Sequence, residues 1–317
     1  LLNPAAEGIL GVEGSKAAGR RAIELFSSRE LDLAVSRAAA GERVDEEIEL
    51  VYPRRMVLHV KSDPVVGAEG KVVATVSAIE DITALKRLNQ IRQDFVANVS
   101  HELRTPVATI RAITDSLLGG AVEERERAGR FLRDLDRETT RLSQLIEDLL
   151  TLSRLEAKEA ALQVEEFDLA ELLRECLDSK GKLAEEYGVA LHAKPGGEGI
   201  SIRGDRSLLR TAVNNLIDNA VKYNRPGGKV TVGAKSEGAN KGATIEVEDD
   251  GIGIPGDELP RIFERFYRID KTRSRESGGT GLGLSIVKHI AELHGGTVNA
   301  ASEEGEGSTF GIFIPGA

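Results

Sequence analysis

Apolar residues recur at steps of three and four through the middle of the chain, which predicts two long amphipathic helices. In the first, from Ala84, the repeating positions are Leu85, Leu88, Ile91, Phe95 and Val99. This spacing is typical of a coiled-coil or helix-bundle seam. We expect the helix to end at Leu118, before Gly119 and Gly120, and a charged turn at residues 123–127 to lead into the second helix.

The second helix carries its own apolar stripe, formed by Phe131, Leu132, Leu135, Leu142, Leu145, Ile146, Leu149, Leu152 and Leu155. A single hairpin of two amphipathic helices buries only part of its apolar surface, whereas two hairpins paired in a four-helix bundle cover it. The pattern therefore predicts that residues 84–160 form an antiparallel helical hairpin and that the chain is a homodimer.

Strand patterns precede these helices. Residues 47–51, 56–60 and 72–79 are rich in Val, Ile and Leu with partial alternation, and residues 16–40 have helical spacing, so residues 1–83 read as a small α+β domain. The opening NPAAEGILG and the closing EDIT resemble a PAS sensor domain that lacks its first strand and runs into an output helix. A dimerising α+β module that binds no ligand is the alternative, and it stays open.

Residues 161–317 alternate between helical and strand patterns and hold most of the 34 glycines. The predicted helices are residues 169–177, 205–223 and 281–293, and the predicted strands are residues 189–193, 229–234, 243–248, 296–301 and 308–314. We therefore expect a sheet with helices packed on it, which makes the whole chain a multidomain α+β protein.

Charge and composition exclude several classes of protein. The 317 residues carry a formal charge of −10, from 42 basic and 52 acidic residues, which argues against nucleic-acid binding. The single cysteine, Cys176, allows neither an internal disulfide nor a cysteine-based zinc site. No apolar run has the length of about 18 residues that a membrane helix needs. We expect the chain as given to be cytoplasmic, and a membrane anchor upstream of Leu1 stays open.

The stretch FVANVSHELRTPVAT, residues 95–109, places His101 on a helix beside a carboxylate. Glu102 could accept one ring N–H and hold the other nitrogen ready to react, and Thr105 lies one turn further on the same face. Pro106 should bend or weaken the helix next to the histidine. Alone, His101 would be read as an ordinary polar residue on an amphipathic helix.

Two later motifs suit a nucleotide. In NNLIDNAVKY, residues 214–223, Asn215, Asn219 and Lys222 share one helix face, where amide and ammonium groups could meet Mg²⁺ and phosphates while Tyr223 packs on a base. In DDGIGIP, Asp249 ends a strand, and Gly251 and Gly253 would let a flat ligand approach the backbone. A helix that is rich in asparagine by chance and an ordinary turn are the plain alternatives.

A second glycine-rich segment, GGTGLGL, opens a helix and offers exposed N–H groups to phosphate. Between the two glycine segments lie six basic residues that suggest a mobile lid: Arg261, Arg265, Arg268, Lys271, Arg273 and Arg275. A solvated basic loop is the alternative.

In combination, these motifs resemble a known family. SHELRTP resembles the phospho-acceptor box of sensor histidine kinases, and NNLIDNAVKY, DDGIGIP, IFERFYR and GGTGLGLSI resemble the N, first glycine, phenylalanine and second glycine boxes of their ATPase domain, in the same order. The chain is therefore similar to a PAS-containing two-component kinase of the phosphate-regulon sensor group. The resemblance implies a HisKA-type hairpin followed by an α/β sandwich ATPase domain of the GHKL (Bergerat) type.

The resemblance also implies a role for each matching residue. His101 would accept the γ-phosphate of ATP, Glu102 would orient it, and Thr105 would serve a phosphatase reaction on the response regulator, the partner whose receiver aspartate takes the phosphate. The implied ATP-binding residues are Asn215 (also the Mg²⁺ ligand), Asn219, Lys222, Tyr223, Asp249, Gly251, Gly253, Arg268, Gly279, Thr280, Gly281, Leu282 and Gly283.

Phosphoryl transfer requires the ATPase domain to reach His101, and residues 157–167 are the expected hinge. Whether transfer runs within or between chains stays open. Two rival classes remain. An ATP-driven conformational machine with the same nucleotide fold would lack the SHELRTP helix, and a non-enzymatic dimeric scaffold would not be labelled by ATP with Mg²⁺.

Overall fold

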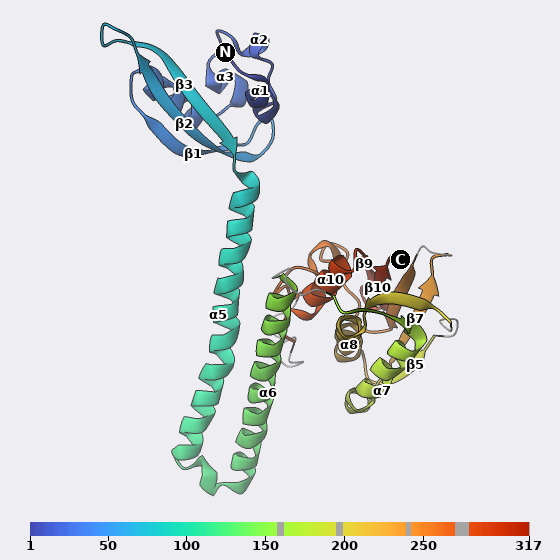
Figure 1. The fold of residues 1–317 in the computed structure, drawn as a ribbon. Helices are drawn as coiled ribbons and strands as arrows, with labels where there is room; N and C mark the ends of the chain where they lie inside the picture. The colour runs from blue at the N-terminus through green and yellow to red at the C-terminus, as the bar shows by residue number, and fades with distance from the viewer. Residues whose placement is uncertain (157–161, 195–198, 239–241, 270–278, 317) are drawn as a thin grey trace. The chain divides into compact units, whose positions relative to one another are not determined.

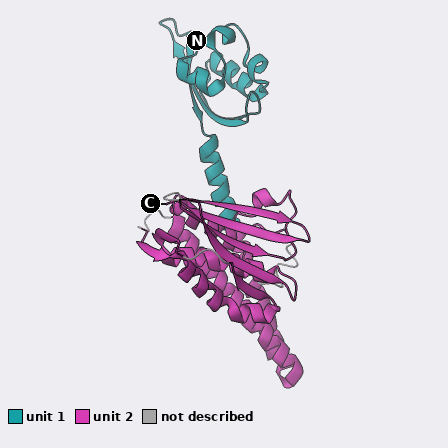
Figure 2. Ribbon diagram, turned by 90° about the vertical axis from the view of Figure 1, so that its right-hand side faces the viewer, with its two compact units in different colours: residues 1–97 teal, residues 98–317 magenta. Residues whose placement is uncertain are grey.

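The computed structural model describes residues 1–156, 162–194, 199–238, 242–269 and 279–316. It divides into two compact units, residues 1–97 and 98–317 (Figure 2). The division falls within one long helix. The domain boundaries expected from the sequence, at residues 83/84 and 160/161, stay a prediction.

The first unit is a three-stranded antiparallel sheet with short helices. Strands β1 (Val44–Leu50), β2 (Met56–Val66) and β3 (Val72–Asp81) lie in that order, as the alternating pattern predicted (Figure 1). Strand β2 is longer than expected, because it continues to Val66 beyond the predicted residue 60. The helices are α1 (Pro4–Leu10), α2 (Gly14–Ala17), α3 (Ala22–Phe26) and α4 (Arg29–Ala39).

The helical spacing of residues 16–40 is therefore divided among three helices. The division has a local cause, because Ser27 adopts the left-handed conformation at the end of α3, with φ 50°, and the Ser28 side chain accepts the Leu31 N–H to begin α4. The helices and one face of the sheet enclose a single core. That core consists of Leu10, Phe26, Leu31, Ala34, Ala38, Val44, Ile48, Leu50, Met56, Leu58 and Val60.

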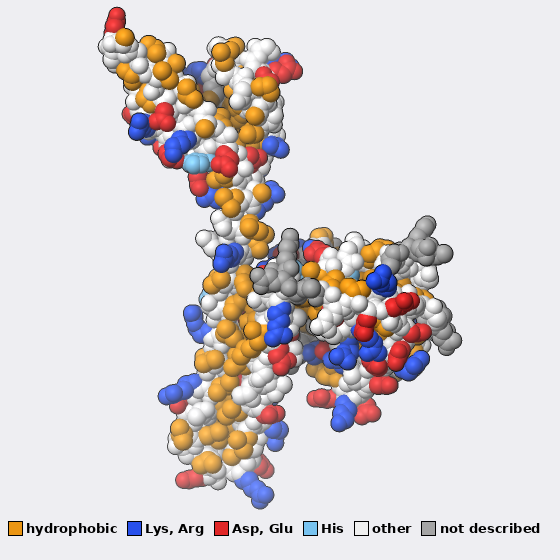
Figure 3. Space-filling model, viewed as in Figure 1, with side chains coloured by type: hydrophobic (Ala, Val, Ile, Leu, Met, Phe, Trp, Pro, Cys, Tyr) orange, Lys and Arg blue, Asp and Glu red, His pale blue; other side chains and the backbone are white. Residues whose placement is uncertain are grey.

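The predicted hairpin is present. Helix α5 (Thr83–Leu118) continues through Pro106, whose side chain is buried, and a 3-10 turn η1 (Ala121–Glu123) leads into α6 (Arg125–Glu156). Gly120 adopts φ 109°, a conformation that glycine takes readily, and this allows the reversal. Several large apolar side chains of the hairpin remain exposed (Figure 3). In the second unit these are Val107, Leu118, Val122, Leu132, Ile146 and Leu150.

The rest of the second unit is a five-stranded sheet with three helices over one face (Figures 1 and 2). The strands, in spatial order, are β5 (Ala190–Ala193), β7 (Lys229–Ser236), β8 (Ala243–Asp249), β10 (Gly307–Ile314) and β9 (Thr297–Glu303). Only the β5–β7 pair is parallel. The helices are α7 (Leu169–Tyr187), α8 (Arg206–Lys222) and α10 (Gly283–Leu293).

This arrangement confirms the multidomain α+β fold class. Alternate strand residues such as Val230, Val232, Ile245 and Ile312 are at most 1% exposed, because they face the helices. The sequence did not predict the small two-stranded sheet of β4 (Val164–Asp168) and β6 (Ser201–Asp205).

Candidate functional site

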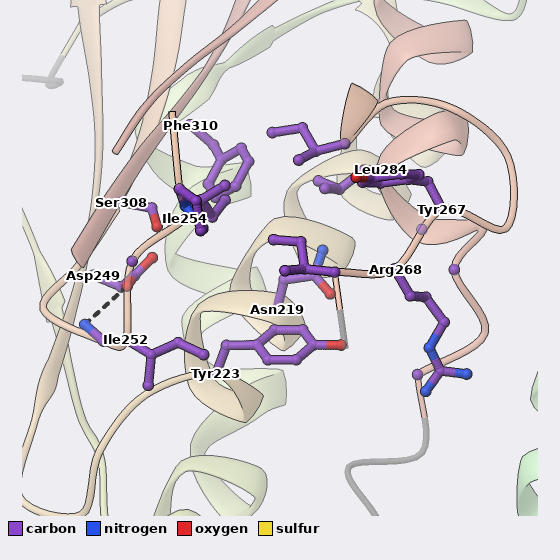
Figure 4. Close-up of a pocket in the computed structure, with 18 of the residues that line it drawn as sticks. Asn219, Tyr223, Asp249, Ile252, Ile254, Tyr267, Arg268, Leu284, Ser308 and Phe310 are labelled. Atoms are coloured by element: carbon purple, nitrogen blue, oxygen red, sulfur yellow. Dashed lines mark hydrogen bonds between the residues drawn. The ribbon is translucent and has the colours of Figure 1, made fainter. Parts of the chain in front are cut away.

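A cavity of about 610 Å³ lies where α8, the end of β8 and the residues before α10 meet (Figure 4). Eleven of the residues expected to bind nucleotide line it. They are Asn215, Asn219, Tyr223, Asp249, Gly251, Gly253, Arg268, Gly279, Thr280, Gly281 and Gly283. The structure therefore brings together four motifs that are far apart in the sequence. A volume of this size is typical of sites for small molecules and cofactors.

Asp249 lies at one end of this cavity. Its Oδ1 accepts the Gly251 N–H at 2.9 Å, which holds the carboxylate at the mouth of the turn that follows β8 (Figure 4). Burial raises the pKa of Asp249 from 3.8 to about 6, although the hydrogen bonds from the Gly251 and Ser308 N–H groups oppose this rise. A half-buried acceptor with this geometry suits a donor such as an amino group on a flat ring.

The glycines beside Asp249 are required by close backbone contacts. A Cβ on Gly251 would lie 2.5 Å from the Tyr223 carbonyl oxygen, and one on Gly253, where φ is 67°, would lie 2.0 Å from the Glu303 carbonyl oxygen. Neither distance is compatible with a side chain. The turn therefore presents backbone to the cavity.

Helix α8 supplies the polar wall. Asn215 donates its Nδ2–H to the Thr211 carbonyl at 2.9 Å, which turns its Oδ1 toward the loop, where a Cβ on Gly283 would lie 2.8 Å away. Asn219 and Tyr223 follow on the same face, with the Tyr223 ring along the cavity (Figure 4). Lys222, at the end of the same helix, does not line the cavity, and its contact with phosphate stays a prediction.

The loop before α10 closes the opposite end of the cavity. Gly281 has φ 73°, and its carbonyl accepts the Phe266 N–H at 2.8 Å. The side chain of Leu282 is fully buried beneath the loop, so only its backbone could serve a ligand. Arg268 lies across the cavity from Asp249 (Figure 4), and its side chain is 7% exposed.

His101 lies outside this cavity, on an exposed face of α5. The expected contact between Glu102 and the His101 ring is not formed. Instead, Glu102 Oε2 lies 3.3 Å from Arg141 Nη2 of α6 and 4.0 Å from Arg268 Nη1. Adjacent helical residues point in different directions, which explains the difference. The Thr105 hydroxyl donates to the His101 carbonyl at 3.2 Å, so these two residues do lie one turn apart.

The similarity to known proteins extends over almost the whole chain. The chain is 35% identical over 300 residues to the sensor-like histidine kinase SenX3 of Mycobacterium tuberculosis. The aligned region covers 92% of this chain and 72% of SenX3. This chain belongs to the sensor histidine kinase family.

Two family descriptions match separate parts of this histidine kinase. Residues 91–158 match the His Kinase A (phospho-acceptor) domain, and residues 204–317 match the histidine kinase-, DNA gyrase B- and HSP90-like ATPase. The sensor histidine kinase WalK of Bacillus subtilis is 36% identical over 259 residues, which are 82% of this chain and 42% of WalK. SenX3 of Mycolicibacterium smegmatis is 40% identical over 75% of this chain, which spans 61% of that protein.

Solved structures of histidine kinases share the fold. The Acinetobacter baumannii histidine kinase AdeS is 26% identical with a TM-score of 0.53, over 68% of this chain and 97% of that one. The histidine kinase ThkA, in complex with the response regulator protein TrrA, matches 100% of this chain and 92% of its own with a TM-score of 0.58. At 22% identity this second match shows the fold alone.

Some expectations for this histidine kinase lie outside the described residues. Lys271, Arg273 and Arg275 of the expected basic lid do so, as do residues 157–161 of the expected hinge at residues 157–167. No cluster of three His, Cys, Asp or Glu that could hold a metal occurs within the described ranges. In the same ranges, no helix is both long enough and apolar enough to span a membrane.

Sequence reasoning missed the apolar part of the cavity and one buried carboxylate. Ile254, Ile262 and Phe310 line the cavity. Ile254 and Ile262 lie within the DDGIGIP and IFERFYR motifs, but neither was expected to contact a ligand, and Phe310 lies in no motif. The carboxylate is Asp148 of α6, which is 7% exposed and accepts a hydrogen bond from the Thr280 hydroxyl at 2.6 Å. Its position among the regularly spaced leucines of α6 was the available signal.

Proposed function

We propose that this protein binds ATP in the cavity and transfers the γ-phosphate to His101, as a protein histidine kinase. The adenine would lie at Asp249 and Tyr223, and the phosphates at the loop of residues 279–283. The cavity volume, the half-buried carboxylate of Asp249 at one end and the N–H groups of the loop at the other all suit an adenine nucleotide.

The observation that carries this proposal is the position of Arg268. Its side chain forms part of the cavity wall, and its Nη1 lies 4.0 Å from the Oε2 of Glu102, the residue next to His101. A guanidinium in this place could neutralise charge on the phosphate that is transferred. The nucleotide cavity and the phosphate acceptor are thus connected through one cation.

In the reaction, a ring nitrogen of His101 would form a bond to the γ-phosphorus while the bond to the β–γ bridging oxygen breaks, and ADP leaves. The attacking nitrogen must be unprotonated, and exposure of the ring to water keeps it accessible. Since the protein makes no covalent intermediate before this step, its contribution is positioning and charge neutralisation.

The chain also offers a ligand for Mg²⁺. The Asn215 Oδ1 faces the loop, and amide oxygens are suitable Mg²⁺ ligands together with phosphate oxygens. When bound, Mg²⁺ would neutralise charge on the phosphates. Asn219 would orient the phosphate chain from the same helix face.

The second substrate would be the receiver domain of a response regulator. ThkA forms a complex with the response regulator protein TrrA, and it shares this chain's fold. We expect an aspartate of the receiver to take the phosphate from His101, and the Thr105 hydroxyl, one turn away, to direct water at the phospho-aspartate in the reverse, phosphatase direction.

The exposed apolar residues of the hairpin support a homodimer, because pairing two hairpins would cover them (Figure 3). The first unit would act as a PAS-like sensor, with a three-stranded sheet leading directly into α5. The same proposal includes three further points: membership of the phosphate-regulon sensor group, an upstream membrane anchor, and a cytoplasmic location for this part of the protein.

Labelling with ATP tests the reaction. The purified protein should incorporate phosphate from γ-labelled ATP with Mg²⁺ but not from α-labelled ATP, the label should be lost in acid, and peptide mapping should place it on His101. An ATP-driven machine related to gyrase or HSP90 would hydrolyse ATP without this label. Absence of both labelling and ATP binding would indicate that the protein is a non-enzymatic dimeric scaffold.

A further inference from the structure

One face of α6 in its second half is buried against α10, and the residues that form it have a regular spacing. Leu145, Asp148, Leu152 and Leu155 follow at steps of three, four and three, and they are 3%, 7%, 0% and 4% exposed. The last residue of the helix, Glu156, adds an ion pair with Arg265 at 2.5 Å. Asp148 is thus a carboxylate at a position where the pattern calls for a leucine.

Both oxygens of this carboxylate are used. Oδ2 accepts the Thr280 hydroxyl at 2.6 Å, and Oδ1 accepts the Gln144 side-chain amide at 2.8 Å. Burial raises the pKa of Asp148, and these two hydrogen bonds and the charge of Lys222 oppose the rise while Glu147 adds to it. A buried carboxylate in an apolar seam is costly unless it is fully bonded, so it favours one docking register of α6 on α10.

Thr280 connects Asp148 to the phosphate end of the cavity. The same hydroxyl that donates to Asp148 accepts the Leu282 N–H at 3.3 Å, at the start of α10. The N-terminus of a helix attracts anions through its free N–H groups and its dipole. The Thr280 hydroxyl therefore links the carboxylate of Asp148 to the N–H of Leu282, the residue that directly precedes α10.

We propose that Asp148 competes with the nucleotide phosphates for the N-terminus of α10, so that docking of α6 on α10 and binding of ATP at the loop oppose each other. Phosphates that take the N–H groups of the loop displace the Thr280 hydroxyl, and their charge repels the buried carboxylate. Binding of ATP then loosens this docked arrangement, which frees the ATPase domain to move relative to α6. This inference rests on the proposed function, because it assumes that phosphates bind at this loop.

Binding measurements on Asp148→Asn test the competition. The substitution keeps the size and an acceptor for Thr280 but removes the charge, so a non-hydrolysable ATP analogue with Mg²⁺ should bind about fivefold more tightly or better. Adenosine, which has no phosphates, should bind with the wild-type affinity. Asp148→Ala, which also removes the hydrogen bond, should show at least the same gain for the analogue.

Glu147→Gln is the matched control, because it removes one charge from the adjacent, exposed position of α6 and should leave both affinities unchanged. Melting curves establish that each variant is folded at the assay temperature. Unchanged or weaker analogue binding by Asp148→Asn overturns the competition, and so does an equal gain for adenosine, which would indicate general loosening. If the wild-type protein binds neither ligand, the proposed function fails, and this inference fails with it.

Discussion

Acidification should weaken binding of the adenine ring, because it protonates the carboxylate of Asp249. The carboxylate is the acceptor at the base end of the cavity, and burial raises its pKa to about 6. A charged acceptor binds an amino group more strongly than a neutral one. Since the bound amino group favours the ionised form, affinity should rise with pH as Asp249 loses its proton.

The size of the effect follows from that pKa. Above about pH 7 most of the carboxylate is ionised, whereas at about pH 5 only about one tenth is, so the apparent affinity should fall about tenfold if only the ionised form binds well. The same rise in the pKa of Asp249 affects the folding free energy in the opposite direction, since it stabilises the folded protein at low pH. A rise in pKa from 3.8 to about 6 corresponds to about 3 kcal/mol of folding free energy, present below about pH 4 and lost as pH rises through about 6. Acidification to pH 5 therefore does not unfold the site through Asp249.

Adenosine is the suitable ligand for this experiment, because ATP carries phosphates that take up protons in the same range of pH. Titration calorimetry at about pH 5, 6, 7 and 8 would measure the slope. Asp249→Asn should bind adenosine weakly at every pH, since its neutral amide cannot ionise. A wild-type affinity that does not change between about pH 5 and 8, or a variant that keeps the wild-type slope, would refute the role of Asp249 as a charged acceptor.

The remaining predictions concern the phosphate and its acceptor. His101→Gln should lower labelling by γ-labelled ATP about a hundredfold or more while ATP affinity stays at the wild-type value. His192→Gln, at another exposed histidine, is the control. Equal labelling of the two variants would contradict the assignment. Asn215→Asp should lower labelling about tenfold or more at saturating ATP. A carboxylate cannot donate to the Thr211 carbonyl as the amide does, and it places a negative charge beside the phosphates. Retained labelling would exclude a metal role for Asn215. Thr105→Ala should keep labelling of His101 but slow dephosphorylation of the cognate receiver domain about tenfold, measured on one preparation, and a wild-type phosphatase rate would show that the hydroxyl has no such role.

The long helices were predictable because their pattern repeats over many residues. The apolar spacing on α5 and α6 continues for several turns, and both helices end close to the expected residues. Short elements gave weaker signals. Strand β4 has a single buried residue, Phe167, so it shows no alternation of apolar and polar residues. The break between α3 and α4 depends on the backbone conformation of Ser27, which the spacing of apolar residues does not indicate.

The polar residues of the cavity were expected mainly because the order of their motifs resembles that of histidine kinases. Chemistry alone explained the residue types (amides on one helix face, a carboxylate after a strand, and glycines where backbone must approach) but left a chance helix and an ordinary turn open. Contacts between distant segments could not be predicted in this way. Asp148 and Thr280 lie 132 residues apart, and the partners of Glu102 come from α6 and from the far side of the cavity. A sequence pattern records which face a residue lies on but not which distant side chain meets it.

The backbone lining of the cavity limits how resistance to an inhibitor could arise. A compound that occupies the base end would contact a turn where a side chain on Gly251 would lie 2.5 Å from one carbonyl oxygen and a side chain on Gly253 would lie 2.0 Å from another. Substitutions that block the compound at these positions would also distort the turn that holds Asp249, and ATP would be excluded together with the drug. Escape mutations should therefore occur at side-chain positions of the rim such as Ile252 or Arg225, and the glycine turn should stay unchanged in resistant strains.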